Sequence, residues 1–261
     1  MTSPVLVTGG TGTLGRLIVP RLRDAGCEVR VLSRSHHEAA EGIEFVTGDL
    51  ATGEGIAPAM DGVGTIVHCA GSAKGDEDKA RNLVAAASRA GAPHLVYISV
   101  VGADRIPIVS RLDRVMFGYF GYKLAAERVI ADSGLPFTTL RATQFHDLVL
   151  MVAQQMVKLP VLPALAVRCQ PIDADEVAAR LTELALGEPA GLVPDMGGPR
   201  VYAMVDLLRG YLRATDRHRP IVPLRQPGKA AQAVRAGANL APEQAVGQRT
   251  WEDFLTERLA S

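Results

Sequence analysis

The sequence of 261 residues has little of several features that mark particular classes of protein. Basic and acidic side chains number 28 each, so there is no excess of positive charge and the formal net charge is zero. Nucleic-acid binders normally carry such an excess to neutralise phosphates, so we expect no nucleic-acid partner. No stretch approaches the roughly 20 consecutive apolar residues that span a bilayer, and the N-terminus has no basic region or apolar signal core. These absences predict a cytoplasmic protein without a membrane partner.

Cysteine is also scarce, with Cys27, Cys69 and Cys169 lying far apart in the chain. Neither a CxxC pair nor a mixed Cys/His spacing is present, which excludes the usual zinc motifs, and we expect no metal. The pattern favours buried free thiols. A nucleophilic Cys69 at the end of a strand is the alternative, although no motif accompanies it.

Short apolar runs alternate with amphipathic segments through the first two thirds of the chain. Runs of Val, Ile and Leu without polar alternation are typical of parallel strands that are buried on both faces by helices. The pattern predicts strands over 4–8, 28–32, 43–47, 65–69, 94–99 and 136–141, and helices over 13–25 and near 75–90, 117–133 and 173–186. The predicted fold class is therefore α/β, a doubly wound Rossmann-type parallel sheet.

The rhythm changes after about residue 142, where prolines interrupt the apolar segments. No linker rich in serine or charge separates this part from the rest. We therefore expect a single domain over 1–261, in which residues about 143–170 and 195–261 form a small C-terminal lobe that caps the substrate side of the sheet.

A glycine-rich turn joins the first predicted strand to the first helix. It reads Gly9-Gly10-Thr11-Gly12-Thr13-Leu14-Gly15, which contains the spacing GxGxxG. In this context the glycines let the main chain approach a pyrophosphate, and the helix N-terminus offers N–H groups and a positive dipole end. The residues predicted to bind the phosphates are Gly9, Thr11, Gly12, Thr13 and Leu14.

The end of the second strand indicates which nicotinamide dinucleotide binds. An acid there would bind the ribose 2′-hydroxyl of NAD, whereas an arginine accommodates the 2′-phosphate of NADP. The sequence has Ser33 and Arg34 and no acid at this place, which favours NADP over NAD. In the alternative interpretation Arg34 is a solvated loop residue.

The third and fourth predicted strands end in further candidates for the cofactor site. Asp49 and Leu50 follow the third strand at the height of the adenine, where Asp49 can accept from the adenine amino group. Cys69, Ala70 and Gly71 follow the fourth strand, and their small side chains would let the cofactor lie against the main chain.

A serine, a tyrosine and a lysine form the candidate catalytic group. Ser99 ends the fifth strand, and Tyr119 and Lys123 are four residues apart, which places both on one face of a helix. A free phenol is too weak a base at neutral pH, and a nearby ammonium lowers its pKa by favouring the phenolate. Tyr122 competes for the phenol role, but it directly precedes the lysine and should point elsewhere.

The motifs TGGTGTLG, GDL, CAG, YISVVG and YxxxK occur in that order, and LAAE and LRATQF follow. Together they resemble the short-chain dehydrogenase/reductase superfamily, in its atypical, NmrA-like NAD(P)-binding branch. The resemblance implies that Tyr119 is the acid/base, that Lys123 holds the nicotinamide ribose, and that Ser99 orients the substrate carbonyl. Thr143 and Phe145 would lie beside the nicotinamide, although Phe145 is as readily a core residue.

These observations predict an NADP-dependent oxidoreductase that transfers hydride to or from a small apolar carbonyl or quinone-like substrate. NmrA-like relatives also include NADP-binding redox sensors without turnover, which is the alternative function. An epimerase or dehydratase of nucleotide sugars is a weaker third reading, because the C-terminal part leaves little room for the larger lobe of those enzymes. The expected oligomeric state is a monomer or a homodimer.

Overall fold

The computed structural model describes residues 3–38, 40–71 and 75–260. Its contacts divide the chain into two compact units. The first, called the sheet unit below, comprises Met1–Ser99, Tyr122–Leu140 and Val177–Val193. The second unit comprises Val100–Gly121, Arg141–Glu176 and Pro194–Ser261. The second unit therefore contains both segments assigned above to a substrate-side lobe, together with residues 100–121; their role as a cap stays a prediction.

Seven strands form one sheet in the order β3-β2-β1-β4-β5-β6-β9 within the described residues. They are β1 (Val5–Thr8), β2 (Val29–Ser33), β3 (Ile43–Thr47), β4 (Thr65–His68), β5 (His94–Val100), β6 (Phe137–Ala142) and β9 (Gly191–Leu192). Neighbours run parallel; Val7, for example, is in register with Val31 on one side and Val67 on the other. Each of the six predicted strands is confirmed to within one residue at either end. The two-residue β9 was not predicted.

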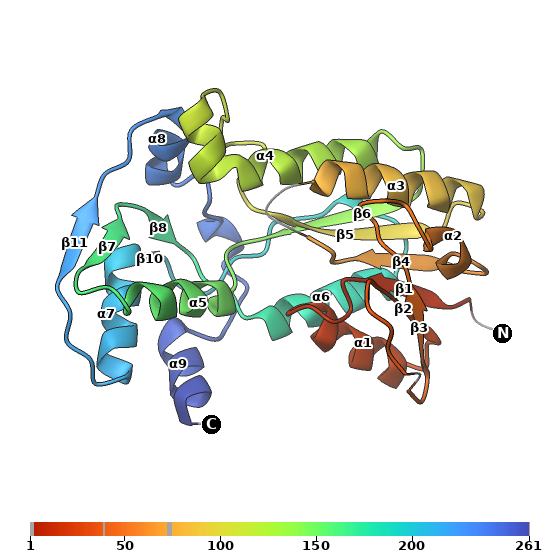
Figure 1. The fold of residues 1–261 in the computed structure, drawn as a ribbon, viewed down its shortest axis with the longest axis horizontal. Coiled ribbons are helices and arrows are strands. Elements are labelled where there is room, and N and C mark those ends of the chain that lie inside the picture. The colour runs from red at the N-terminus through yellow and green to blue at the C-terminus, as the bar shows by residue number, and fades with distance from the viewer. Residues whose placement is uncertain (1–2, 39, 72–74, 261) are drawn as a thin grey trace. The chain divides into compact units, whose positions relative to one another are not determined.

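Helices cover both faces of this sheet, which confirms the doubly wound α/β fold (Figure 1). One face carries α1 (Gly15–Asp24) and the part of α6 (Ala174–Leu186) from Val177 onward. The other carries α2 (Ile56–Ala59), α3 (Asp76–Arg89) and the part of α4 (Arg111–Ala131) from Tyr122 onward. Beneath α3 and α4 a fully buried layer joins the helices to the strands, with Leu6, Ile66 and Leu95 from the sheet against Leu83 and Ile130. Burial of this layer drives the strands and helices together.

Helix α4 begins at Arg111, earlier than the predicted start near residue 117. The reason is a cap that the sequence analysis did not use. The Asp113 carboxylate accepts hydrogen bonds from the N–H and the hydroxyl of Ser110, at 3.0 and 2.7 Å, and the Ser110 hydroxyl accepts from the Asp113 N–H. Such reciprocal bonds satisfy N–H groups that the first turn of a helix leaves without partners.

The second unit has short strands and helices around its own core. They are α5 (His146–Met156), β7 (Leu162–Leu165), β8 (Arg168–Cys169), β10 (Tyr202–Ala203), α7 (Met204–Ala214), β11 (Ile221–Leu224), α8 (Lys229–Ala236), η1 (Pro242–Gln244) and α9 (Trp251–Ala260). Strands β8 and β10 pair antiparallel, and β7 and β11 pair parallel. Trp251 is fully buried and donates from Nε1 to the Leu207 carbonyl at 3.1 Å. Within the described residues, none of the helices combines the length and the hydropathy needed to cross a bilayer.

Candidate functional site

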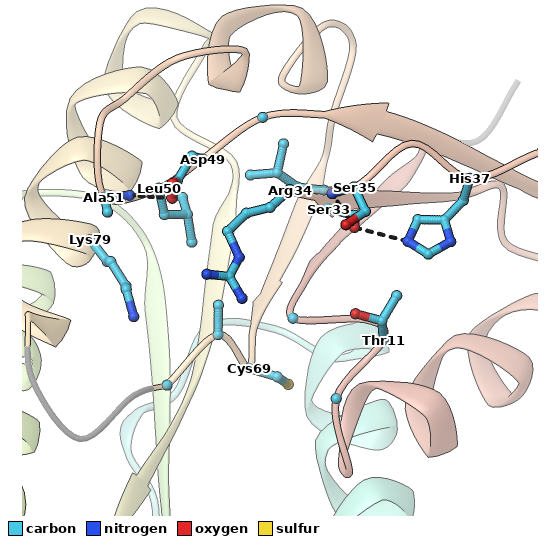
Figure 2. A pocket seen from close by; sticks show the side chains of 16 residues that line it. Thr11, Ser33, Arg34, Ser35, His37, Asp49, Leu50, Ala51, Cys69 and Lys79 are labelled. Atoms are coloured by element: carbon cyan, nitrogen blue, oxygen red, sulfur yellow. Dashed lines mark hydrogen bonds between the residues drawn. The ribbon is translucent and has the colours of Figure 1, made fainter.

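A cavity of about 480 Å³ opens in the sheet unit, where the carboxyl ends of β1 to β4 meet (Figure 2). The strand order changes direction between β1 and β4, and ligands of open α/β sheets bind in the crevice at such a switch point. Many of the residues predicted from sequence line this cavity: Gly9, Thr11, Gly12, Ser33, Arg34, Asp49, Leu50, Cys69, Ala70 and Gly71.

The turn after β1 gives the cavity its backbone wall. The Gly12 N–H donates to the Gly9 carbonyl at 3.0 Å, and α1 begins three residues later. No described side chain caps α1, and its first turn contains no acidic residue. The Arg16 and Leu17 N–H groups already donate to the Gly12 and Leu14 carbonyls, so this end of α1 offers an anion mainly its positive dipole. Thr13 is exposed and Leu14 is buried, and neither side chain lines the cavity; a role for them rests on their main chain.

Gly15 and Gly12 in this turn have different neighbours. Their substitution therefore distinguishes a glycine needed for packing from one that leaves room for a ligand. A Cβ at Gly15 would lie 2.2 Å from the Gly9 oxygen, inside the turn. We expect Gly15→Ala to lower the free energy of unfolding by about 1–3 kcal/mol, as overpacking does. A Cβ at Gly12 would meet only the Gly9 oxygen, at 3.2 Å, so Gly12→Ala should cost less stability. Denaturant unfolding of both variants measures this, and equal stability of Gly15→Ala and the wild type would contradict the packing role.

Arg34 carries positive charge into the cavity. Figure 2 shows its side chain extending from the end of β2 into the hollow, and the residue is exposed. No carboxylate in the described part of the chain forms an ion pair with it. The neighbouring Ser33 Oγ accepts from the Ser35 N–H at 3.2 Å and lies 3.1 Å from His37 Nε2. The β2 loop is thereby ordered, while the Arg34 guanidinium stays available for an anionic group.

A second loop, after β3, forms the opposite side of the cavity. Asp49 Oδ1 accepts from the Ala51 N–H at 2.8 Å, closing a tight turn. Asn82 on α3 donates from Nδ2 to the Leu50 carbonyl at 2.8 Å. Asn82 therefore braces the loop that presents Asp49 and Leu50, which is a packing role within the sheet unit.

Sequence reasoning missed several residues that also line the cavity: Leu32, Ser35, His37, Gly48, Ala51 and Lys79. Most of them directly adjoin residues that were predicted, so the ends of β2 and β3 were a usable signal. Lys79 had a weaker signal: it is one of only five lysines, and it stands near the start of a predicted helix. Figure 2 shows its side chain directed toward the cavity from α3.

The three predicted catalytic residues are placed differently. Ser99 is 5% exposed, and its Oγ has no hydrogen-bond partner in the described residues. Lys123 is buried in the sheet unit, where Nζ donates to the Ile98 carbonyl at 3.2 Å and lies 3.3 Å from the Tyr97 hydroxyl. Tyr119 belongs to the second unit and is 42% exposed. Helix α4 carries both Tyr119 and Lys123, one full turn apart.

Thr143 and Phe145, predicted to lie beside the nicotinamide, both fall in the second unit. Thr143 is buried and donates from Oγ1 to the Gln170 carbonyl at 2.5 Å. Phe145 is half-buried and directly precedes α5. Their place beside a nicotinamide stays a prediction.

Burial controls the ionisable groups behind the cavity. Desolvation raises the pKa of the Cys69 thiol to about 12, so it is protonated at neutral pH and is a poor nucleophile. Desolvation also lowers the pKa of Lys123, and the Asp76 carboxylate acts in the opposite direction. The described residues contain no group of three or more His, Cys, Asp or Glu side chains that could hold a metal ion.

Comparisons with known proteins agree with this geometry. The sequence profile of a family described as NAD(P)H-binding matches residues 9–157. The photosystem II assembly factor Ycf39 of Synechocystis is 31% identical over 153 residues, 54% of this chain and 44% of that protein. The (4-alkanoyl-5-oxo-2,5-dihydrofuran-3-yl)methyl phosphate reductase of Streptomyces griseus is 31% identical over 147 residues, 54% of this chain and 48% of that enzyme. The chain thus spans about half the length of these curated relatives.

Among solved structures, an NADPH-dependent quinone oxidoreductase of Escherichia coli in complex with NADPH has the same fold. Its TM-score is 0.81 at 18% identity, and the match covers 98% of this chain and 99% of that one. The profile match extends over more than half of the sequence and includes the turn after β1 and the ends of β2 to β6. The chain therefore belongs to the family described as NAD(P)H-binding.

Proposed function

We propose that this protein is an NADP-dependent oxidoreductase that transfers hydride to or from a small apolar carbonyl or quinone-like substrate. The observation that supports it most is the cavity at the carboxyl ends of β1 to β4, into which Arg34 extends. Membership of an NAD(P)H-binding family adds support, as does the similarity to a reductase of Streptomyces griseus.

The residues around the cavity fit the parts of an NADP molecule. The uncapped start of α1 suits a pyrophosphate, and the Arg34 guanidinium suits a 2′-phosphate, for which charge-assisted hydrogen bonds are strong. On the β3 side, Asp49 and Leu50 line the cavity and would contact the adenine. The cavity volume of about 480 Å³ lies within the range usual for small-molecule and cofactor sites. Bound NADPH would supply the hydride.

Side chains of the protein would then supply the proton that the reduced carbonyl oxygen needs. In the reducing direction Tyr119 donates its phenolic proton to the carbonyl oxygen as negative charge develops there. The Ser99 hydroxyl, whose donor is unused in the described structure, donates a hydrogen bond to the same oxygen. The Lys123 ammonium binds ribose hydroxyls and stabilises the phenolate that remains on Tyr119.

A substrate panel tests the proposal. Purified protein is mixed with NADPH and, in turn, with quinones, aromatic aldehydes and ketones, and the loss of NADPH absorbance is followed. We expect substrate-dependent loss with at least one quinone or apolar carbonyl, and a lower rate with NADH. NADPH binding without any consumption across the panel would contradict the enzymatic function while leaving the cofactor assignment intact.

That second outcome corresponds to the alternative function, an NADP-binding protein that acts through a partner rather than through turnover. Two observations favour it. Ser99 and Lys123 are both buried, and one of the similar curated proteins is named as an assembly factor. In this case NADPH would bind to the β1–β4 cavity and alter a partner contact. Pull-down of a partner that depends on NADPH, in a protein inactive on the whole panel, would support it.

A further inference from the structure

A buried ion pair lies behind one wall of the cavity. Lys123 Nζ, from α4, is 3.3 Å from Oδ2 of Asp76, the first residue of α3. The two side chains are only 5% and 2% exposed. Oppositely charged groups removed from water to this extent interact strongly. The attraction between them offsets the cost of burying each charge. The sequence analysis did not select Asp76.

This ion pair lies directly against Gly71, which lines the cavity. A Cβ at Gly71 would be 3.1 Å from Lys123 Nζ and 3.6 Å from Asp76 Oδ2. A side chain on any residue that replaced Gly71 would therefore press against the Lys123 ammonium. The ammonium thus lies at the cavity wall although the Lys123 side chain does not line the cavity itself.

Two titratable neighbours of Lys123, His68 and Cys69, carry no charge at neutral pH. His68 is the last residue of β4, Cys69 directly follows that strand, and Tyr97 comes from β5. Burial lowers the pKa of His68 to about 3 and raises that of Cys69 to about 12, so both are uncharged. Lys79, on α3, is a second cation, 3.7 Å from Asp76 Oδ1. Among the described ion pairs, Asp76 is the carboxylate partner of Lys123; the buried Glu127 lies one turn further along α4.

We propose that Asp76 is the positioning residue of Lys123: its carboxylate holds the ammonium against the Gly71 wall of the cofactor cavity and keeps it protonated there. The inference rests on the proposed function only in taking NADPH as the ligand of this cavity. Its consequence is that Asp76 governs the pH range over which Lys123 can donate hydrogen bonds to a bound nucleotide.

The experiment measures Lys123 directly and NADPH affinity in parallel, from pH 6 to pH 10. The ¹³Cε resonance of Lys123, assigned by its absence in Lys123→Met, reports protonation without any cofactor. Loss of the Asp76 charge in Asp76→Asn removes an interaction that favours the ammonium, so the Lys123 midpoint should fall by roughly one pH unit or more. Because binding uses the ammonium, NADPH affinity in Asp76→Asn should begin to fall at a correspondingly lower pH.

Two further variants distinguish the effect of the Asp76 charge from a general effect on helix α3. Asp76→Glu keeps the carboxylate, so the Lys123 midpoint should stay near that of the wild type. Asp78→Asn removes an exposed carboxylate from the same first turn of α3, which controls for the helix dipole, and should leave the midpoint unchanged. An equal fall of the midpoint in Asp78→Asn and Asp76→Asn would overturn the proposal, and so would an unchanged midpoint in Asp76→Asn.

A buried pair that loses one partner sometimes prevents folding, so the double variant Lys123→Met/Asp76→Asn completes the design. If Asp76 acts through Lys123, adding Asp76→Asn to Lys123→Met should change NADPH affinity by less than about twofold. A tenfold further loss would show that Asp76 contacts the nucleotide itself and would overturn the positioning role. A wild type that binds no NADPH refutes the proposed function, whereas the ¹³C titration still decides the role of Asp76.

Discussion

Tyr119→Phe is expected to lower kcat by about 10²–10⁴-fold on any substrate that the panel identifies, because it removes a proton donor from the transition state. The dissociation constant for NADPH should change little, since the cavity at β1–β4 does not include this residue. Stopped-flow single turnovers with saturating NADPH separate the chemical step from cofactor binding.

Tyr122→Phe is the matched control for this experiment. Tyr122 lies on the same helix directly before Lys123, so its loss removes one phenol from nearly the same sequence position. Tyr122 is half-buried and has no role in the proposed chemistry, so the variant should keep kcat within about threefold of the wild type. Comparable losses in both variants, or full turnover in Tyr119→Phe, would remove Tyr119 as the acid.

Arg34→Ala should weaken NADPH binding by about 10- to 150-fold and leave NADH binding nearly unchanged. The reason is that hydrogen bonds to charged groups contribute roughly 1.5–3 kcal/mol, and only NADPH carries the 2′-phosphate. The exposed position of Arg34 at the cavity edge suits such a contact, and the charge should also make NADPH affinity fall with added salt.

Isothermal titration with both nucleotides measures the NADPH/NADH ratio directly. Arg23→Ala serves as the control, because Arg23 is a partly exposed arginine at the far end of α1, paired with Asp24 at 2.8 Å. It should not alter the ratio. If Arg34→Ala leaves the ratio unchanged, the assignment of Arg34 to the 2′-phosphate is wrong.

The sequence alone was sufficient for six of the seven described strands of the sheet and for the glycine-rich turn after β1. Strands buried on both faces need continuous apolar runs, and those runs stand out locally, as at Val5–Thr8 and Val29–Ser33. The turn was equally visible, because a helix start that approaches phosphates needs glycines at short fixed spacing. Both signals come from residues that are neighbours in the chain, so no tertiary information was required to read them.

Fewer strands of the second unit were predicted from the sequence, because two of them contain prolines. Pro163 and Pro223 were treated as interruptions, yet both lie inside paired strands, β7 and β11. A proline is tolerated at the outer edge of a sheet, and each strand of a two-stranded sheet has a free edge. Each of these short strands is stabilised by a partner strand nearly 60 residues away in the sequence. A local sequence pattern gives no sign of such a distant partner.

What the sequence determined by itself was therefore the parallel α/β sheet, the glycine turn, and most residues at the ends of β1 to β4, since parallel strands bring their carboxyl ends to one edge. The tertiary structure alone decided that Lys123 meets Asp76, 47 positions earlier, that Lys79 reaches the cavity, and that Ser99 is buried. These outcomes depend on side chains from separate helices and strands that meet only when the chain folds. The charge state of a buried ionisable side chain depends on the groups that folding brings next to it. The spacing of residues along the chain does not reveal those neighbours.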